Sequence, residues 1–380
     1  MGLKFKDKRI LVITGDAGFG HRSAAEAIQS ALEAGYGDHC EVILKNPLDH
    51  PDAPHFLQES ESDYDDIIEA EPGLYHFAYD LSDASLPVTL LEGGLVMFLL
   101  KVFRQVVLDV KPDLVISTYP IFQAPLTEAI DVEGLDLPVM IVVTDLVTVH
   151  QVWFHDKVTR ITVPTETVRE LALESGITEE QVIETGIPVD PKIAALKAVG
   201  VSELRQELGW EVDPISLLVV GSPRVFDLMA ILHALDEVDA DLQFALVAGG
   251  NDALYEDFAT ATWRHPAKVY NYVETIPEMM RAADVVLCKA GGLITTESLA
   301  SELPMMIVNY LPGQEEGNVD YVVSHGAGAL CDTPDKAVET LKAWLEDGGV
   351  RLRKVAENAA RAGRAEAAQK IAEEAWKLLV

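Results

Sequence analysis

Cysteine is scarce in this sequence, and no apolar run is long enough to span a membrane. Three cysteines, Cys40, Cys288 and Cys331, occur among 380 residues, and none belongs to a C-x-x-C pair. That spacing excludes a zinc ribbon and argues against a disulfide framework, so we expect a reducing compartment. The richest apolar stretch, within Tyr75–Val110, falls short of the roughly 20 apolar residues of a membrane helix, because charged residues interrupt it: Glu92, Lys101, Arg104 and Asp109.

Positive charge is also in short supply. The chain has 29 Lys and Arg against 62 Asp and Glu, which gives a net charge of −33. This charge repels nucleic acids and anionic lipid head groups, so no nucleic-acid partner is expected. After the basic start, Met1–Arg9, the next apolar stretch is only Ile10–Thr14. It is too short for a signal peptide, and we expect a cytoplasmic protein.

Short apolar runs alternate with helical stretches along the chain, a pattern typical of parallel α/β folds. Two such series are separated by the segment Gly186–Pro191. They predict two Rossmann-like domains, with a hinge near Gly186–Gly200, that face each other across a cleft at the carboxyl ends of their strands. The predicted strands are Arg9–Thr14, Cys40–Lys45, Leu114–Ser117, Val139–Thr144, Arg160–Val163 and Val182–Thr185, then Ser216–Val220, Gln243–Ala248, Lys268–Asn271, Val285–Cys288 and Met305–Asn309. The alanine-rich stretch Val355–Leu379 predicts one long terminal helix.

The first glycine-rich motif, Thr14–Ala25, lies between a predicted strand and a predicted helix. Its glycines permit positive φ angles, and the helix start presents free N–H groups. The spacing G-x-x-G-x-G differs from the dinucleotide fingerprint, and the second strand ends in Lys45-Asn46 without an acid for a ribose. These differences argue against NAD. They leave His21 at the mouth of the first strand, as a candidate general base.

A second motif has the same strand–glycine–helix form. It covers Cys288–Glu297 and is followed by Leu311–Asn318. The helix start offers N–H groups and a favourable dipole to a diphosphate. The carboxylate of Glu297 either accepts hydrogen bonds from ribose hydroxyls or is simply a favourable acid near a helix start. Further hydrogen-bonding groups for a sugar follow the next strand: Gln314, Glu315 and Asn318.

These motifs resemble the family of monogalactosyldiacylglycerol synthases and processive diacylglycerol glucosyltransferases, which is related to the MurG-type transferases. Thr144–Phe154, Val163–Glu166 and Thr185–Val189 also fit the pattern of that family. The resemblance implies a GT-B fold with an acceptor domain at 1–186, a nucleotide-sugar domain at 187–365 and a terminal helix at 366–380 that crosses back to the first domain. It also implies transfer of a hexose from UDP-galactose or UDP-glucose to an acceptor hydroxyl, with diacylglycerol as the expected acceptor.

The same resemblance implies roles for individual residues. His21 matches the family's candidate base, and Asp145 is expected to orient the base or the acceptor. The helix start near Leu293, without a metal ion or other cofactor, would stabilise the departing UDP in a single displacement with inversion. The remaining donor-side residues are Gly20, Gly221, Arg224, Gly291, Gly292, Glu297, Gln314, Glu315 and Asn318, and the acceptor-side residues are Gly18, Phe19, His150, Trp153, Leu90 and Leu91.

The sequence departs from the family pattern at two places. The first is Gly221–Val225, where Pro223 removes one N–H donor and Arg224 could supply a charged contact instead. The second is Ile294, which stands where relatives often carry threonine. We interpret Asp63-Tyr64-Asp65 and Asp239-Ala240-Asp241 as exposed acidic stretches and not as metal ligands.

The apolar stretch before the third predicted strand has two interpretations. Leu95, Leu99, Val102, Val106 and Val110 recur at helical spacing and predict a core helix. Leu86–Leu91 precedes the Gly93-Gly94 break and is where relatives would approach lipid. We therefore expect weak, peripheral contact with the inner face of the cell membrane.

Other functions remain open from the sequence. A UDP-sugar 2-epimerase shares the predicted architecture and would need no acceptor. The altered turn at Gly221–Val225 would suit a non-catalytic sugar-nucleotide sensor, although His21 argues against it. A MurG-like acceptor is a further alternative. The sequence decides neither the sugar and the acceptor nor the oligomeric state.

Overall fold

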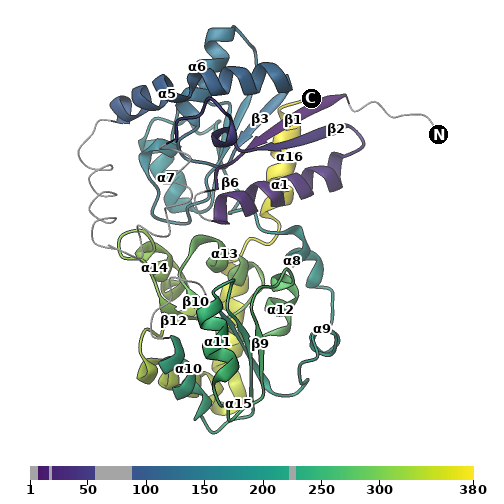
Figure 1. Cartoon of the computed structure of the whole chain (residues 1–380), viewed down its shortest axis with the longest axis vertical. Coiled ribbons are helices and arrows are strands. Elements are labelled where there is room, and N and C mark those ends of the chain that lie inside the picture. Colours follow the sequence, from purple (N-terminus) through teal and green to yellow (C-terminus); the bar gives the residue numbers. More distant parts are fainter. Residues whose placement is uncertain (1–6, 17–18, 56–87, 222–227) are drawn as a thin grey trace, which may run out of the picture. The chain divides into compact units, whose positions relative to one another are not determined.

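The computed structural model describes residues 7–16, 19–55, 88–221 and 228–380. The chain forms two compact units (Figure 1). Unit 1 comprises Met1–Pro191 together with Glu366–Val380, and unit 2 comprises Lys192–Ala365. Each unit is built on one six-stranded sheet whose paired strands run parallel. The sequence placed the first boundary at residue 186, and the contacts place it after Pro191.

Unit 1 has the strand order β2-β1-β3-β4-β5-β6, so the chain steps outward from β1 in both directions. The carboxyl ends of β1, β3 and β4 are therefore neighbours, and the loops that follow them lie together. Its elements are β1 (Lys8–Ile13), α1 (Phe19–Tyr36), β2 (Cys40–Lys45), η1 (Pro47–Asp49), α5 (Val88–Val110), β3 (Leu114–Ser117), α6 (Gln123–Glu133), β4 (Val139–Val142), η2 (Gln151–Trp153), β5 (Arg160–Val163), α7 (Glu166–Glu174), β6 (Val182–Glu184) and α16 (Ala367–Lys377).

Apolar side chains cover both faces of the unit 1 sheet. One face packs against α5 and α6, with Phe103 and Phe122 at its centre. The other face packs against α1 and α16, which lie side by side in Figure 1. The ring of Trp376 stacks on Tyr36 with centroids 4.6 Å apart. A helix that follows unit 2 in the sequence thus completes the core of unit 1.

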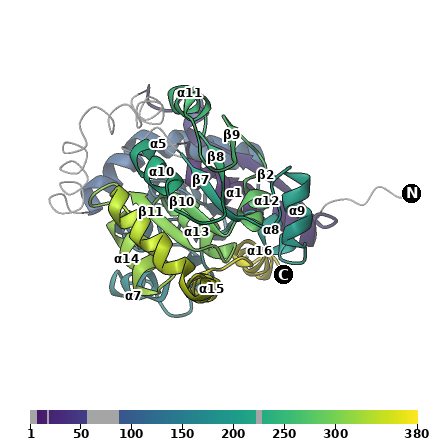
Figure 2. The same ribbon diagram turned by 90° about the horizontal axis from the view of Figure 1, so that it is seen from below.

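Unit 2 has the strand order β12-β11-β10-β7-β8-β9. Two apolar clusters fill the two faces of its sheet, and Figure 2 shows β7 and β10 between α10 on one side and α13 on the other. Its elements are α8 (Pro191–Leu196, which begins at the boundary), α9 (Val201–Glu207), β7 (Ile215–Val220), α10 (Leu228–Asp236), β8 (Leu242–Val247), α11 (Asp252–Thr260), β9 (Ala267–Tyr270), α12 (Ile276–Ala282), β10 (Val285–Lys289), α13 (Gly292–Ala300), β11 (Met305–Asn309), α14 (Glu316–Ser324), β12 (Gly328–Leu330) and α15 (Pro334–Ala362).

The predicted strands all occur, with bounds that differ by no more than two residues. The sequence missed β12, a three-residue strand without a β-branched side chain. The prediction of one continuous helix over Val355–Leu379 was wrong, because α15 ends at Ala362 and α16 begins at Ala367. At Gly363 the backbone passes so close to α13 that a Cβ atom would lie 2.1 Å from the carbonyl oxygen of Leu299. The chain there is extended, which ends the helix.

The predicted core helix before β3 is confirmed as α5. Leu99, Val102, Val106 and Val110 are each at most 5% exposed, at helical spacing. Met97 and Phe98 lie outside this stripe and are exposed. Leu90 and Leu91 belong to the first turn of α5, and their side chains lie outside the described residues. Within the part of the chain that the structure describes, none of the helices combines the length and the apolar character needed to cross a membrane.

The cysteine prediction can be checked directly. All three cysteines are free thiols in buried positions. Burial raises the pKa of Cys288 to about 12 and that of Cys331 to about 11. The thiols are therefore protonated members of the core, in agreement with the expectation that no disulfide framework exists.

Candidate active site

His21 lies in the first turn of α1, directly after the glycine-containing loop that follows β1. The loop places the imidazole at the carboxyl edge of the unit 1 sheet, near the ends of β3 and β4. Gly20 is the second residue of α1. Gly18 and the side chain of Phe19 lie outside the described residues, so their predicted acceptor roles stay predictions.

Residues from two other strand ends surround His21. Its Nδ1 lies 2.7 Å from the hydroxyl of Thr144, directly after β4. The ring of Tyr119, after β3, meets the imidazole edge-on with centroids 5.0 Å apart. The hydroxyl of Thr118 donates to the His21 carbonyl oxygen over 3.0 Å, which ties the start of α1 to β3. The imidazole, which itself follows β1, is therefore held in a fixed position by groups from the ends of β3 and β4.

Asp145 influences His21 through its charge. Burial lowers the pKa of His21 below its ordinary value, while the carboxylate of Asp145 and hydrogen bonding to the Thr118 backbone act in the opposite direction. The indole N–H of Trp153 donates to Asp145 Oδ2 over 2.6 Å and fixes that carboxylate. The Trp153 ring is fully buried, 6.1 Å from the His21 ring. A histidine with a lowered pKa is neutral at physiological pH, the form that can accept a proton.

A polar clamp secures the loop on the other side of His21. Arg22 donates from Nη2 to Asp16 Oδ2 over 2.8 Å and also from Nε to Oδ1, and Asn46 donates to the same carboxylate over 3.0 Å. The hydrogen bonds from Arg22, and then from Asn46, hold the pKa of Asp16 below its usual value, against the effect of burial. Asp16 thus stays ionised and joins the two ends of the glycine loop. The contacts of Asp16 with Arg22 and Asn46 were not predicted from the sequence.

His150 has a local structural contact. Its Nδ1 accepts a hydrogen bond from the Val152 N–H over 3.1 Å and caps η2. This cap fixes the start of the turn that carries Trp153. The predicted acceptor role of His150 stays a prediction, and its position close to the Asp145–Trp153 pair is compatible with that role.

The candidate donor site in unit 2 is the start of α13. Gly291 is the N-cap residue and makes no side-chain cap, so the first N–H groups of the helix, from Gly292 onward, have no intrahelical acceptor. A Cβ atom on Gly291 would lie 3.6 to 3.8 Å from Ile294, Glu315 and Lys289, so a longer side chain would fill the space in front of the helix. This arrangement suits an anionic group.

A buried ion pair joins the loops after β10 and β11. Lys289 Nζ lies 2.6 Å from Glu315 Oε1, and the two side chains are 11% and 8% exposed. Glu315 Oε2 accepts from the Leu311 N–H over 2.7 Å. Asn318 donates to the Ala290 carbonyl oxygen over 2.9 Å. The side chains of Glu315 and Asn318 therefore hold the glycine turn at Gly291 in place. These contacts within the fold were not predicted from the sequence.

The other predicted donor residues are placed as follows. Leu293 and Glu297 belong to α13 and are partly buried, as is Gln314 in the loop after β11. Gly221 directly follows β7, and a Cβ atom there would lie 2.4 Å from the Leu254 side chain. Arg224 lies outside the described residues. Contacts with a donor stay predictions for all of these residues.

The structure places the Asp145 carboxylate where its charge acts on His21, and it adds Thr144 and Tyr119 to the surroundings of the imidazole. The catalytic role of Asp145 stays a prediction. Thr144 begins the segment Thr144–Phe154, which fits the family pattern, and it directly precedes Asp145. Its place beside a predicted catalytic residue could have indicated a contact with His21. Tyr119 follows the third strand, and only the strand order places it beside His21. Lys289 lies within the predicted donor motif Cys288–Glu297, but no role was predicted for it.

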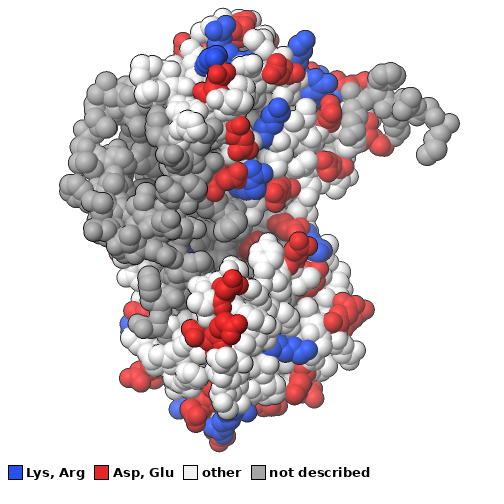
Figure 3. Space-filling view, viewed as in Figure 1, with Lys and Arg blue, Asp and Glu red and all other residues white. Residues whose placement is uncertain are grey.

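Acidic side chains are spread over the visible face of both units and do not form a single patch (Figure 3). Of the two D-x-D tripeptides, Asp63-Tyr64-Asp65 lies outside the described residues, and Asp239 pairs with Arg264 over 3.4 Å. Among the residues in 7–16, 19–55, 88–221 and 228–380, no group of three or more His, Cys, Asp or Glu side chains is arranged to hold a metal ion.

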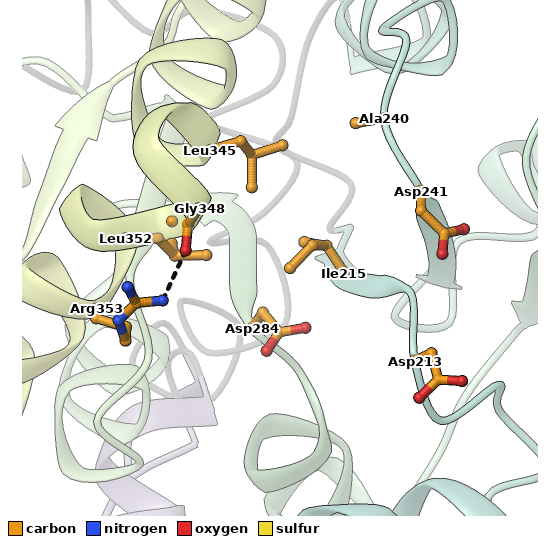
Figure 4. Close-up of a pocket in the computed structure, with 10 residues that line it drawn as sticks. Asp213, Ile215, Ala240, Asp241, Asp284, Leu345, Gly348, Leu352 and Arg353 are labelled. Carbon is orange, nitrogen blue, oxygen red and sulfur yellow. Dashed lines mark hydrogen bonds between the residues drawn. The ribbon is translucent and has the colours of Figure 1, made fainter.

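A cavity of about 380 Å³ lies in unit 2 between the starts of the strands and a non-helical interruption of α15 at residues 346–349 (Figure 4). Ile215 begins β7, and Asp284 precedes β10. Arg353 donates to the Gly348 carbonyl oxygen over 2.8 Å beside the cavity. Since nucleotides bind beyond the carboxyl ends of strands in such sheets, this cavity at their amino ends is separate from the candidate donor site.

Comparison with known proteins yields two family models that match in succession. Residues 21–189 match the model of monogalactosyldiacylglycerol (MGDG) synthase, and residues 217–375 match that of the glycosyltransferase family 28 C-terminal domain. A probable chloroplastic MGDG synthase of Nicotiana tabacum is 30% identical, covering 98% of this chain and 71% of its own length. MGDG synthase 3 of Arabidopsis thaliana is 29% identical, covering 95% and 79%.

Solved structures resemble the chain over nearly its whole length. MurG of Acinetobacter baumannii has a TM-score of 0.63 at 15% identity, covering 97% of this chain and 99% of its own. S. aureus MnaA, solved with UDP, has a TM-score of 0.60 at 15% identity, covering 98% of each chain. At these identities the likeness shows the fold alone, and that fold is GT-B, as the sequence predicted.

Proposed function

Because the chain belongs to the monogalactosyldiacylglycerol synthase family, we propose that it transfers a galactosyl residue from UDP-galactose to the hydroxyl group of a diacylglycerol. One observation supports the proposal most: relatives named for this activity are 30% identical over nearly the whole of this chain. We assign the acceptor to unit 1, around His21, and the donor to unit 2, at the start of α13.

The proposed reaction is one displacement with inversion. His21 takes the proton from the acceptor hydroxyl as the oxygen forms its bond to the anomeric carbon. The bond from that carbon to the diphosphate oxygen breaks, and UDP leaves with the electron pair. The lowered pKa of His21 supports this role, because the imidazole is neutral before the reaction. Asp145, fixed by Trp153, then stabilises the imidazolium that forms.

The departing UDP acquires negative charge, and the N–H groups at the start of α13 stabilise that charge. Its uncapped N–H groups and helix dipole favour an anion without any movement. Glu297, in the second turn of α13, would accept hydrogen bonds from ribose hydroxyls. We propose that no metal ion is needed, since the helix start already offers positive potential at the diphosphate.

The acceptor is a lipid, so unit 1 must meet a membrane surface. We propose that the first turns of α5 make this contact. Met97 is 71% exposed and Phe98 45%, and Lys101 on the same helix is also exposed. An apolar group beside a cation suits a peripheral interfacial contact. The net charge of −33 opposes anionic lipid and keeps the contact weak.

The test is turnover of purified protein with UDP-galactose, UDP-glucose and UDP-N-acetylglucosamine, each with and without dioctanoylglycerol. We expect galactolipid from UDP-galactose, and the anomeric proton of the product should show inversion by NMR. A parallel series with EDTA tests the metal-free mechanism. Formation of a new sugar nucleotide without acceptor would instead identify a 2-epimerase. Absence of lipid product with every donor would refute the proposal.

A further inference from the structure

Gln123, the first residue of α6, is buried with neither of its amide atoms paired. The side chain is 1% exposed, and both Oε1 and Nε2 lack a hydrogen-bond partner. Most buried polar side-chain atoms in proteins are hydrogen-bonded, because an unpaired buried group is costly. An amide with a free donor and a free acceptor therefore calls for a function.

The position of Gln123 connects it with the candidate base. Gln123 directly follows Phe122, whose ring lies 4.8 Å from that of Tyr119. Tyr119 in turn meets the His21 ring edge-on at 5.0 Å. The start of α6, which carries Gln123, is thus linked to the imidazole by two ring contacts, through Phe122 and Tyr119, at the carboxyl edge of β3.

The backbone around Gln123 adds free donors. α6 begins after Phe122, which provides no side-chain cap, so the N–H groups of Gln123 and Ala124 have no intrahelical acceptor, whereas Pro125 has no N–H group and Leu126 already donates to the Phe122 carbonyl oxygen. The carbonyl oxygens of the same turn are already used: Thr127 Oγ1 donates to that of Gln123 over 2.9 Å, and also contacts His155 Nε2. The unused groups at this helix start are therefore mainly donors, together with the Gln123 amide.

This set of groups suits a neutral, oxygen-rich ligand. An amide can accept from a hydroxyl and donate to an ester carbonyl, and a helix start favours partial negative charge on oxygen. A fully charged anion fits less well, because the Asp145 carboxylate lies in the same part of unit 1. The glycerol portion of a diacylglycerol offers one hydroxyl and two ester carbonyls.

We propose that Gln123 and the start of α6 bind the glycerol oxygens of the acceptor and hold its free hydroxyl at His21. This assignment rests on the proposed function. It makes Gln123 a binding residue for the acceptor, and it explains why a polar side chain occupies a position where Met or Leu would stabilise the unliganded fold.

The experiment compares Gln123→Met with a control on the same helix, Thr127→Val. Methionine keeps the length of the side chain and removes its hydrogen-bonding groups. We expect the KM for dioctanoylglycerol to rise at least tenfold at saturating UDP-galactose, with the Kd for UDP unchanged and the Tm not lowered. Thr127→Val removes hydrogen bonds that the fold contains, so its Tm should fall while its KM changes less than threefold.

Three results would overturn the inference. A KM within twofold of wild type in Gln123→Met would show that the acceptor does not use the amide. A loss of Tm as large as in Thr127→Val would show that the amide is paired within the folded protein. If Gln123→Met fails to fold, Gln123→Leu, which also lacks the amide, takes its place, and a wild-type KM in that variant is equally decisive. A wild-type enzyme without activity on dioctanoylglycerol would refute the proposed function as well.

Discussion

The two units carry the same type of sheet but different kinds of site. In unit 1, one titratable side chain, His21, is surrounded by groups from the ends of β3 and β4. In unit 2, the main chain at the start of α13 provides the binding groups, and a buried ion pair holds it in place. Unit 1 is thus suited to moving a proton, and unit 2 to holding an anion. Changes to side chains should therefore affect catalysis in unit 1, and binding or stability in unit 2.

The largest effect is expected from His21→Ala. Loss of a general base should reduce transfer by about 10²–10⁴-fold, while UDP binding in unit 2 stays unchanged. Steady-state rates and calorimetric titration with UDP measure the two quantities separately. His39→Ala is the matched control, because His39 is an exposed histidine shortly after the carboxyl end of α1. Turnover near that of wild type in His21→Ala would contradict the division of labour between the units.

The buried pair in unit 2 provides the next test. Lys289→Met leaves the Glu315 carboxylate buried without its cation, which should cost about 3 kcal/mol in the free energy of unfolding. Hydrogen exchange of the β10 and β11 amides measures this cost in unit 2 alone. Lys336→Met, which breaks the exposed pair with Asp332, should leave the free energy of unfolding almost unchanged, because water screens an exposed ion pair. Equal costs in the two variants would show that burial of the pair is unimportant.

Glu297→Gln tests the donor side directly. Loss of a charged hydrogen bond to ribose should weaken UDP binding by about 1.5–3 kcal/mol. Glu339→Gln, an exposed acid on α15, serves as the control and should leave the Kd unchanged. Calorimetric titration gives the Kd for UDP of both variants. Equal values in the two variants would show that Glu297 does not bind the ribose and only stabilises the helix.

The pH dependence of unit 1 offers a finer test. His21 acts as a base only when neutral, so kcat/KM should fall as the pH drops through its pKa, which burial lowers below 6.5. Asp145 raises this pKa, so Asp145→Asn should move the acidic limb of the profile to lower pH. Asp131→Asn, at the far end of α6, should leave the limb in place. A shift to higher pH in Asp145→Asn would exclude the proposed coupling.

The smallest effect concerns the membrane. Serine at both Leu90 and Leu91, in the first turn of α5, should reduce flotation of the protein with diacylglycerol-containing liposomes by about half, with the Kd for UDP unchanged. Leu108→Ser changes a leucine near the other end of α5 that is 43% exposed, and should float like wild type. Flotation at two salt concentrations separates apolar from electrostatic contact. Equal flotation of all variants would remove this turn from the acceptor side.

The fold could be predicted from the sequence because apolar runs and glycine turns are local signals. The positions of the two candidate donor segments could also be predicted, since Cys288–Glu297 and Leu311–Asn318 are each contiguous and lie at the ends of adjacent strands, whereas their contacts with a donor stay a prediction. The surroundings of His21 could not, because Tyr119 and Thr144 are about a hundred residues away in the sequence and meet the imidazole only through the strand order. Gly363 was missed for a similar reason: its close approach to Leu299 is a tertiary contact.

The place of α16 in unit 1 has a consequence for biosynthesis. Its residues Ala368, Ile371, Ala372 and Ala375 complete the apolar cluster that includes β1 and α1, although the ribosome makes all of unit 2 before them. Unit 2 spans Lys192–Ala365, and at about 5–20 residues per second its translation takes roughly 10–35 s. During that interval α1 already covers part of this face of the unit 1 sheet, but the part that packs against α16 is uncovered. Chaperones that bind apolar surface are therefore expected to act on unit 1 first, until α16 has emerged.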